Sequence, residues 1–249
     1  MQRYFAKQGS EDGRFTISGD DARHIAKVMR MEKGDRIFCV SPDGRTALCE
    51  IENITGENVE AAVVKWEEGS SELPILITIA SGLPKGDKLE YIIQKGTELG
   101  AFAFVPFIAS RSVVKWDEKK AAKKTERLMK IAKEAAEQSH RSHVPDVASP
   151  TGLKELAEMA KSYSHKLVAY EEEAKRGEKS ALAEVLGNMS SGQTLFTVFG
   201  PEGGLSEQEV SFLKEQGFRE CSLGPRILRT ETAPLYLLSA ASYQTELMR

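Results

Sequence analysis

The spacing of hydrophobic and polar residues changes near residue 70. Before this point, short runs rich in β-branched and aromatic residues partly alternate apolar with polar positions, as half-buried strands do. Asp43-Gly44 and residues 56–58 supply turn signals between them. One stretch, residues 20–30, has helical spacing instead. Several short strands with one helix predict a small β-barrel whose strands are residues 14–19, 35–42, 46–54 and 58–66.

After the polar linker 67–74, apolar runs alternate with amphipathic segments. Runs such as residues 75–82 are apolar throughout, which is typical of strands buried on both faces of a parallel sheet. The pattern predicts two domains, residues 1–70 and 74–249, the second an α/β fold with helices on both faces of the sheet. Its predicted strands are residues 75–82, 103–109, 166–170, 194–200 and 220–224, and its predicted helices are 88–100, 117–139, 151–162, 179–187, 206–216 and 231–247.

The composition is that of an ordinary globular protein, with 41% hydrophobic and 29% charged residues among 249. No run approaches the roughly 18 apolar residues of a membrane span, and the N-terminus lacks the apolar core of a signal peptide, so we expect a cytoplasmic protein without membrane contact. Three widely spaced cysteines predict buried reduced thiols. His140 and His143 have no cysteine or carboxylate at ligand spacing nearby, so we expect no metal.

The net charge of −3 exerts no general attraction on nucleic acid, but its distribution is uneven. Residues 111–133 hold nine basic and three acidic side chains. Such a cluster indicates either an anionic partner or a solvated helix face, and the residues alone favour neither.

Gly200-Pro-Glu-Gly-Gly204 directly follows a predicted strand. Its three glycines allow a ligand to approach the backbone where a Cβ would collide. Ser206 and Glu209 have the spacing of a capping box, which predicts the start of a helix. The loop matches neither of the common glycine-rich phosphate motifs, and this counts against an NTPase or a dinucleotide enzyme.

A second loop, LGPRILRTETAPLY (residues 223–236), opens with a Gly-Pro turn. Thr230 or Thr232 is predicted to cap the last helix. Arg226 and Arg229 lie close to the start of that helix, where the dipole disfavours cations. We therefore expect these arginines to meet an anion, such as an RNA phosphate or a developing negative charge.

Four segments together carry a resemblance: GPEGGL (200–205), LGPRILRTETA (223–233), SGLPKGDKLEYIIQKGTELG (81–100) and EAAEQSHR (134–141). They resemble the bacterial 16S rRNA uridine N3-methyltransferase family (RsmE) of the SPOUT superfamily, and the resemblance covers essentially the whole chain. It implies a PUA-like β-barrel that holds RNA, followed by a SPOUT-type parallel sheet with a C-terminal trefoil knot. It also implies a homodimer that transfers methyl from S-adenosylmethionine to N3 of one uridine in the decoding region of the small ribosomal subunit, with S-adenosylhomocysteine as product.

The clustering of Arg229 and Glu231 in the second loop motivates a catalytic hypothesis: Arg229 would stabilise charge at a uracil oxygen, and Glu231 would orient the base or accept its proton. The resemblance implies the cofactor- and RNA-binding residues. The family often has glycine where this chain has His140, so the turn there is the one departure. The expected cofactor-binding residues are Ala169, Tyr170, Glu171, Phe199, Gly200, Pro201, Glu202, Gly203, Gly204, Leu223, Gly224, Pro225, Ile227, Leu228, Thr230 and Ala233. The expected RNA-binding residues are Arg3, Lys85, Lys88, Arg111, Lys120, Lys124, Arg127, Gln138, Arg141 and Arg226.

Three other functions compete with this interpretation. A non-catalytic RNA-binding or ribosome-assembly protein would have no use for the two cofactor loops. An α/β enzyme for another nucleotide would need the missing phosphate motifs. A SPOUT enzyme that methylates a ribose or a guanine is disfavoured by the full-length resemblance.

Overall fold

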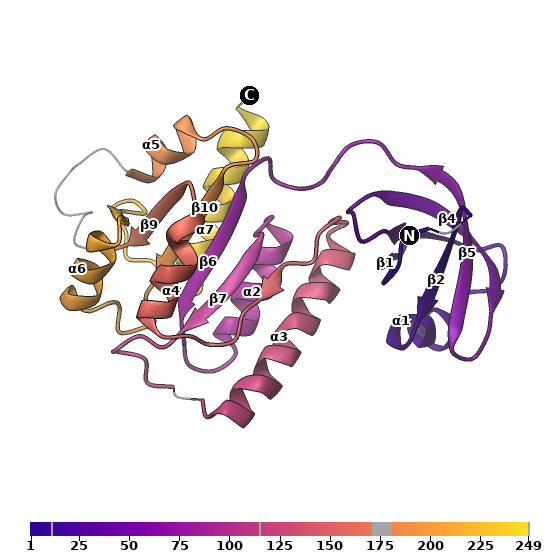
Figure 1. Cartoon of the computed structure of the whole chain (residues 1–249), viewed down its shortest axis with the longest axis horizontal. Helices are drawn as coiled ribbons and strands as arrows, with labels where there is room; N and C mark the ends of the chain where they lie inside the picture. The colour runs from indigo at the N-terminus through magenta and orange to yellow at the C-terminus, as the bar shows by residue number, and fades with distance from the viewer. Residues whose placement is uncertain (11, 115, 171–180, 249) are drawn as a thin grey trace. The chain divides into compact units, whose positions relative to one another are not determined.

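The computed structural model describes residues 1–10, 12–114, 116–170 and 181–248 (Figure 1). The chain divides into two compact units. The first unit holds residues 1–72 together with residues 136–143, and the second holds the rest. Hydrophobic spacing did not predict that residues 136–143 pack with the N-terminal unit.

The first unit is built on one five-stranded sheet with the order β1-β3-β4-β5-β2. β1 and β3 are parallel, and the other pairs are antiparallel. Among the described residues β1 and β2 are the edge strands, so closure into a barrel stays a prediction. The elements are β1 (Arg3–Phe5), β2 (Arg14–Ser18), α1 (Asp20–Arg23) with the π-helical turn η1 (His24–Val28), β3 (Arg36–Val40), β4 (Thr46–Ile54) and β5 (Asn58–Trp66).

Alternation along β4 sends Ala47, Cys49 and Ile51 into the core of this unit, where they meet Phe15 and Ile37. The structure confirms residues 46–54 and 58–66 as strands with the predicted bounds. β1 was not predicted, because three residues are too few to show a period.

The second unit contains a six-stranded sheet, parallel throughout, with the order β11-β9-β10-β6-β7-β8. The predicted parallel α/β fold is therefore confirmed. The short strand β8 was not predicted. The strands are β6 (Leu76–Gly82), β7 (Ala103–Phe107), β8 (Asp146–Val147), β9 (His165–Ala169), β10 (Thr194–Phe199) and β11 (Arg219–Cys221).

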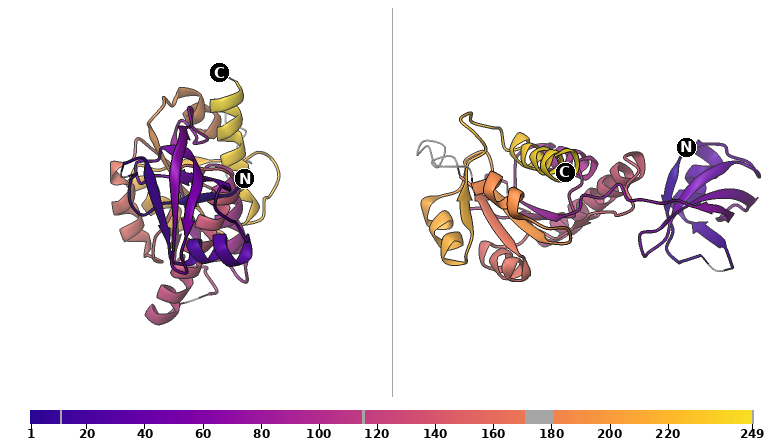
Figure 2. Two further views of the ribbon diagram at one scale, coloured as in Figure 1. Left: turned by 90° about the vertical axis from the view of Figure 1, so that its right-hand side faces the viewer. Right: turned by 90° about the horizontal axis from the view of Figure 1, so that it is seen from above.

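Helices cover both faces of this sheet (Figures 1 and 2). Successive side chains of β10 point to opposite faces, so Leu195 and Phe199 join one core while Phe196 and Val198 join the other. The first core is closed by α2 (Lys88–Glu98), α3 (Glu118–Gln138), α5 (Ala181–Asn188) and α7 (Thr232–Ser242), the last extended by the π-helical turn η4 (Tyr243–Leu247). The second core is closed by α4 (Leu153–Met159), which continues as η2 (Ala160–Ser162), and by α6 (Glu207–Glu215).

The state of the three cysteines agrees with the sequence. Cys39, Cys49 and Cys221 are free and buried, as predicted. Within the described ranges, none of the helices combines the length and the apolar character that crossing a membrane requires.

Because the strands of the second unit are parallel, the loops that follow β6, β9, β10 and β11 all emerge at one edge of the sheet. The loop after β10 leads into α6 through the predicted capping box, which the structure confirms. The Glu209 backbone N–H donates to Ser206 Oγ at 3.3 Å, and the Ser206 N–H donates to the Glu209 carboxylate at 2.8 Å. This edge is where the candidate site lies.

Candidate active site

A cavity of about 740 Å³ opens at the carboxyl edge of the parallel sheet, within the second unit. Its volume falls in the range of roughly 300–1,000 Å³ that small-molecule and cofactor sites have. The ends of β9, β10 and β11 and the loops that follow the latter two form its wall. The lining residues are Lys88, Arg111, Ala169, Tyr170, Phe199, Gly200, Pro201, Glu202, Gly203, Gly204, Leu205, Cys221, Ser222, Leu223, Gly224, Pro225, Arg226, Ile227, Leu228, Arg229, Thr230 and Ala233.

The loop after β10 turns back on itself so tightly that Gly200 has no room for a side chain. A Cβ there would lie 2.8 Å from the Gly204 carbonyl carbon and 2.9 Å from the Leu205 nitrogen. Gly204 itself has φ +68°, and its N–H donates to the Pro201 carbonyl at 2.8 Å. The glycines thus allow a turn that presents backbone groups, rather than side chains, to the cavity.

The loop after β11 is joined to this turn by Thr230, whose hydroxyl donates to the Gly200 carbonyl at 2.5 Å. The prediction that Thr230 or Thr232 caps the last helix is wrong. Glu231 holds the N-cap position without a side-chain hydrogen bond, and Thr232 is already the first residue of α7. The Thr230 hydroxyl cross-links the two loops instead.

A lysine and two glutamates form a charged cluster at the rim of the cavity. Lys88 Nζ lies 2.9 Å from Glu202 Oε1 and 3.4 Å from Glu231 Oε2. Glu202 Oε1 also accepts a hydrogen bond from the Lys85 backbone N–H at 3.1 Å. The Glu231 oxygen is buried, and its contact with Lys88 is an ion pair rather than a hydrogen bond. Glu231 itself does not line the cavity.

Arg226 and Arg229 line the cavity with exposed side chains. The Arg229 carbonyl accepts from the Thr232 and Ala233 N–H groups at 2.9 and 3.0 Å, which fixes its backbone at the start of α7. Among the described residues, no hydrogen bond or ion pair reaches either guanidinium. Both cations are therefore available to an incoming anion.

Every predicted cofactor-binding residue that the structure describes lines this one cavity. Glu171 lies outside the described residues, as does Lys115 of the basic segment. Leu205, Cys221 and Ser222 also line the cavity and were missed. Each lies within two residues of a predicted segment, so extending the two loops by one or two residues would have found them.

The expected RNA-binding residues fall in several places. Lys88, Arg111 and Arg226 line the cavity. Arg111 Nη1 donates to the Gly203 and Leu205 carbonyls at 3.0 and 3.3 Å, so this side chain braces the loop after β10.

The basic face of α3 and the loop before α2 hold four more of these residues. Lys85 and Lys120 have exposed side chains, and Lys124 Nζ lies 5.8 Å from the centroid of the Trp116 ring. Arg127 forms an ion pair with Glu90 at 2.7 Å, with 65% of its side chain exposed. α3 therefore presents a cationic surface to solvent.

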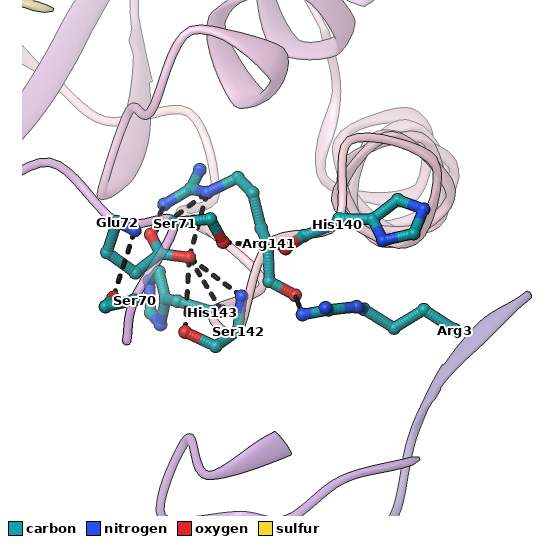
Figure 3. Close-up of polar contacts among 8 residues, drawn as sticks. All are labelled: Arg3, Ser70, Ser71, Glu72, His140, Arg141, Ser142 and His143. Atoms are coloured by element: carbon teal, nitrogen blue, oxygen red, sulfur yellow. Dashed lines mark hydrogen bonds and ion pairs between the residues drawn. The ribbon is translucent and has the colours of Figure 1, made fainter. Parts of the chain in front are cut away.

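Arg141, by contrast, belongs to the first unit and has only 3% of its side chain exposed. Figure 3 shows its guanidinium turned toward the carboxylate of Glu72. Its Nε donates to Glu72 Oε2 at 3.0 Å, and its Nη2 forms an ion pair with the same oxygen. Glu72 Oε1 accepts from the N–H groups of Ser142 at 2.8 Å and His143 at 3.2 Å. This burial leaves no guanidinium surface for RNA, so we assign Arg141 a structural role in place of the expected one.

Arg3 and Gln138 belong to the same unit. Arg3 Nη1 donates to the Arg141 carbonyl at 3.0 Å, and its guanidinium lies 5.5 Å from the Phe38 ring centroid. Gln138 is exposed at the end of α3. The next turn places His140 at φ 58°, the left-handed conformation that glycine adopts most easily. This conformation is the physical reason why glycine suits the position.

The described residues contain no group of three or more His, Cys, Asp or Glu side chains placed to hold a metal ion.

Comparison with known proteins gives this geometry a context. Residues 71–242 match the RNA methyltransferase domain family, and residues 17–64 match the RNA methyltransferase PUA domain family. These matches define the chain as an RNA methyltransferase with a PUA domain.

The relatives narrow the class. The chain is 55% identical to Ribosomal RNA small subunit methyltransferase E of Bacillus subtilis (strain 168), over 100% of this chain and 99% of the relative. It is 31% identical to the protein of the same name from Mycobacterium bovis, over 92% of this chain and 86% of the relative. A solved structure also matches: the crystal structure of Ribosomal RNA small subunit methyltransferase E from Neisseria gonorrhoeae, bound to S-adenosyl methionine. The TM-score is 0.84, the sequence identity is 30%, and the match covers 97% of each chain. This chain belongs to the ribosomal RNA small subunit methyltransferase E family.

Proposed function

We propose that this protein transfers a methyl group from S-adenosylmethionine to N3 of a specific uridine of 16S rRNA, in the decoding region of the small ribosomal subunit. Family membership and the cofactor-bound relative support the reaction class. The observation that carries the proposal is the cavity, because the loops after β10 and β11 meet there and their glycines line it.

The cavity fits S-adenosylmethionine in size and in chemistry. Its wall offers the backbone groups of the turn at Gly200 and of the loop from Leu223 to Leu228, together with apolar side chains suited to the two faces of an adenine. Ile227 is 78% exposed and so has surface available to a ligand. We assign the expected cofactor-binding residues, other than Glu171, to this role.

The reaction requires activation of the base, since uracil N3 carries a proton and is a poor nucleophile until that proton leaves. When bound, the cofactor supplies a methyl group already activated by its sulfonium. Arg229 would stabilise the developing charge on a uracil oxygen, as its exposed guanidinium at the cavity allows. Glu231, with a buried carboxylate oxygen that receives no hydrogen bond, would orient the base or accept the proton.

RNA would bind through the cationic surface of the second unit. Lys120, Lys124 and Arg127 on α3 would contact phosphates and give salt-dependent affinity. Arg226 at the cavity would contact a phosphate close to the target base. Residues 1–70 would serve as the RNA-holding PUA-like barrel and residues 74–249 as the methyltransferase domain.

The family resemblance motivates further proposals. The C-terminal loops and α7 would form a trefoil knot of the SPOUT type, and two copies of the chain would form a homodimer. A ribosomal substrate would require the enzyme to work in the cytoplasm, and neither a metal nor a membrane would take part.

Isothermal titration of S-adenosylmethionine into wild type and Gly200→Ala tests the cofactor proposal. The added Cβ would lie under 3.0 Å from two backbone atoms of the same turn, so the turn must shift and affinity should fall at least about tenfold, or 1.4 kcal/mol. Gly187→Ala is the matched control, because a Cβ there meets nothing within 4 Å and lies on α5, away from the cavity. Absence of binding by folded wild type, or equal affinity of Gly200→Ala and wild type, contradicts the proposal.

A further inference from the structure

We propose that Lys88 is a positioning residue that locks the two loops of the cofactor cavity together through Glu202 and Glu231, and that it does not bind RNA phosphate. This inference rests on the proposed function, since it takes S-adenosylmethionine as the ligand of the cavity.

The place of Lys88 in the fold is unusual for a cation. It is the first residue of α2, and the positive end of the helix dipole disfavours a lysine there. The two glutamates offset this cost, at 2.9 and 3.4 Å from its nitrogen. Because the ion pairs with the glutamates offset the cost of this position, we expect the role of Lys88 to lie in those ion pairs.

The partners come from the two loops that form the cavity. Glu202 belongs to the loop after β10, and Glu231 ends the loop after β11. Lys88 thus connects the two loops to each other and to α2. The hydrogen bond from Thr230 to the Gly200 carbonyl is the second cross-link between the same loops. The hydrogen bond with Glu202 is the largest cause of the raised pKa of Lys88.

The charges around Lys88 also argue against a role as a phosphate ligand. Its side chain is 30% exposed and its ammonium has two carboxylates as neighbours, so the cluster as a whole carries excess negative charge. A phosphate would have to displace one carboxylate and approach the other. Arg226 and Arg229, which no described side chain neutralises, are better placed for that task.

Removal of the ammonium would leave two carboxylates near each other without a cation between them. Their repulsion would push apart the loops that carry the backbone groups of the cavity. The cofactor then has to bind a site that is no longer held in its binding geometry, and its affinity falls.

The test compares Lys88→Met, Lys88→Arg and the matched control Lys95→Met. Lys95 lies on the same helix and pairs with Glu98 at 2.7 Å, but it does not line the cavity. Titration of S-adenosylmethionine should show Kd raised about tenfold in Lys88→Met, largely restored in Lys88→Arg and unchanged in Lys95→Met. Because a structural defect alone would lower Tm in parallel, Tm is recorded for each variant and should stay near that of wild type.

Two further measurements distinguish this positioning role from a role independent of Glu202 and from an RNA phosphate contact. If carboxylate repulsion is what raises Kd in Lys88→Met, adding Glu202→Gln to that variant should remove the repulsion and return Kd toward the wild-type value, which a double-mutant cycle measures. Binding of a 16S rRNA transcript at several salt concentrations should keep its wild-type slope in Lys88→Met. Unchanged cofactor Kd in that variant, or a slope reduced by about one, overturns the proposal in favour of a phosphate contact. If wild type itself does not bind the cofactor, it is the proposed function that fails.

Discussion

The substitution Glu72→Gln tests whether the carboxylate of Glu72 holds residues 140–143 in the first unit. The change keeps the size of the side chain but removes its negative charge. The side chain of Arg141 is 3% exposed and that of Glu72 is 22% exposed, so the buried guanidinium would face a neutral amide in place of the Glu72 carboxylate. Three backbone and side-chain donors of Ser142 and His143 would also face a weaker acceptor.

The expected cost follows from this burial. Breaking a buried ion pair by removing one partner costs about 3–5 kcal/mol, and glutamine retains one acceptor oxygen, so we expect about 3 kcal/mol. That is a large share of the roughly 5–15 kcal/mol that stabilises a typical domain. For a unit of this size, each kcal/mol corresponds to about 4–8 °C, so Tm should fall by about 12 °C or more.

The assay is thermal unfolding followed by circular dichroism, with hydrogen exchange used to locate the loss of protection in residues 136–143. Glu52→Gln is the control, because it makes the same chemical change in the Arg14–Glu52 pair of the same unit. That pair has a 2.8 Å contact but exposed side chains, so its loss should leave Tm close to wild type. Equal and small shifts for the two variants would refute the reasoning.

Three more predictions follow from individual residues. His140→Gly should raise stability by up to about 1 kcal/mol, since φ 58° strains a residue with a Cβ; a lower Tm would contradict this. Burial raises the pKa of Cys221 to about 12, and Cys39 and Cys49 are fully buried, so no thiol of the native protein should react with Ellman's reagent at pH 8, whereas three should react after unfolding. Burial raises the pKa of Glu209, but hydrogen bonds from Ser206 and Ser110 outweigh it and lower the pKa overall. Its stabilising contribution is therefore complete above the pKa of the unfolded state and is lost as pH falls through the lower native pKa. Between pH 6 and pH 3 the Tm of Glu209→Gln should fall by less than the Tm of wild type.

Periodicity predicted most of the fold because it reports directly on burial. β4 and β5 alternate over nine residues each, and their bounds agree with the prediction. β1 and β8 have three and two residues, too few for a period to appear. The packing of residues 136–143 with the first unit was not predictable either, because the helical pattern of α3 runs on to Gln138 without a break in spacing.

The candidate site was predictable where local chemistry carries the signal. Glycine-rich turns after buried strands mark places where a ligand can approach the backbone, so the cavity loops were found. The partners of charged side chains were not predictable, because Lys88 meets Glu202, and Arg141 meets Glu72, across long separations in sequence. Spacing cannot distinguish a cation that awaits RNA from one that is already paired.

The most direct test of the central claim is methyl transfer itself. Wild-type protein is incubated with small ribosomal subunits and S-adenosylmethionine labelled in its methyl group, and the 16S rRNA is digested and its nucleosides separated by mass spectrometry. The proposed function predicts label in 3-methyluridine at one position, lost in Arg229→Ala while that variant still binds the cofactor. Absence of label in the RNA, or label in a ribose or a guanine, would contradict it.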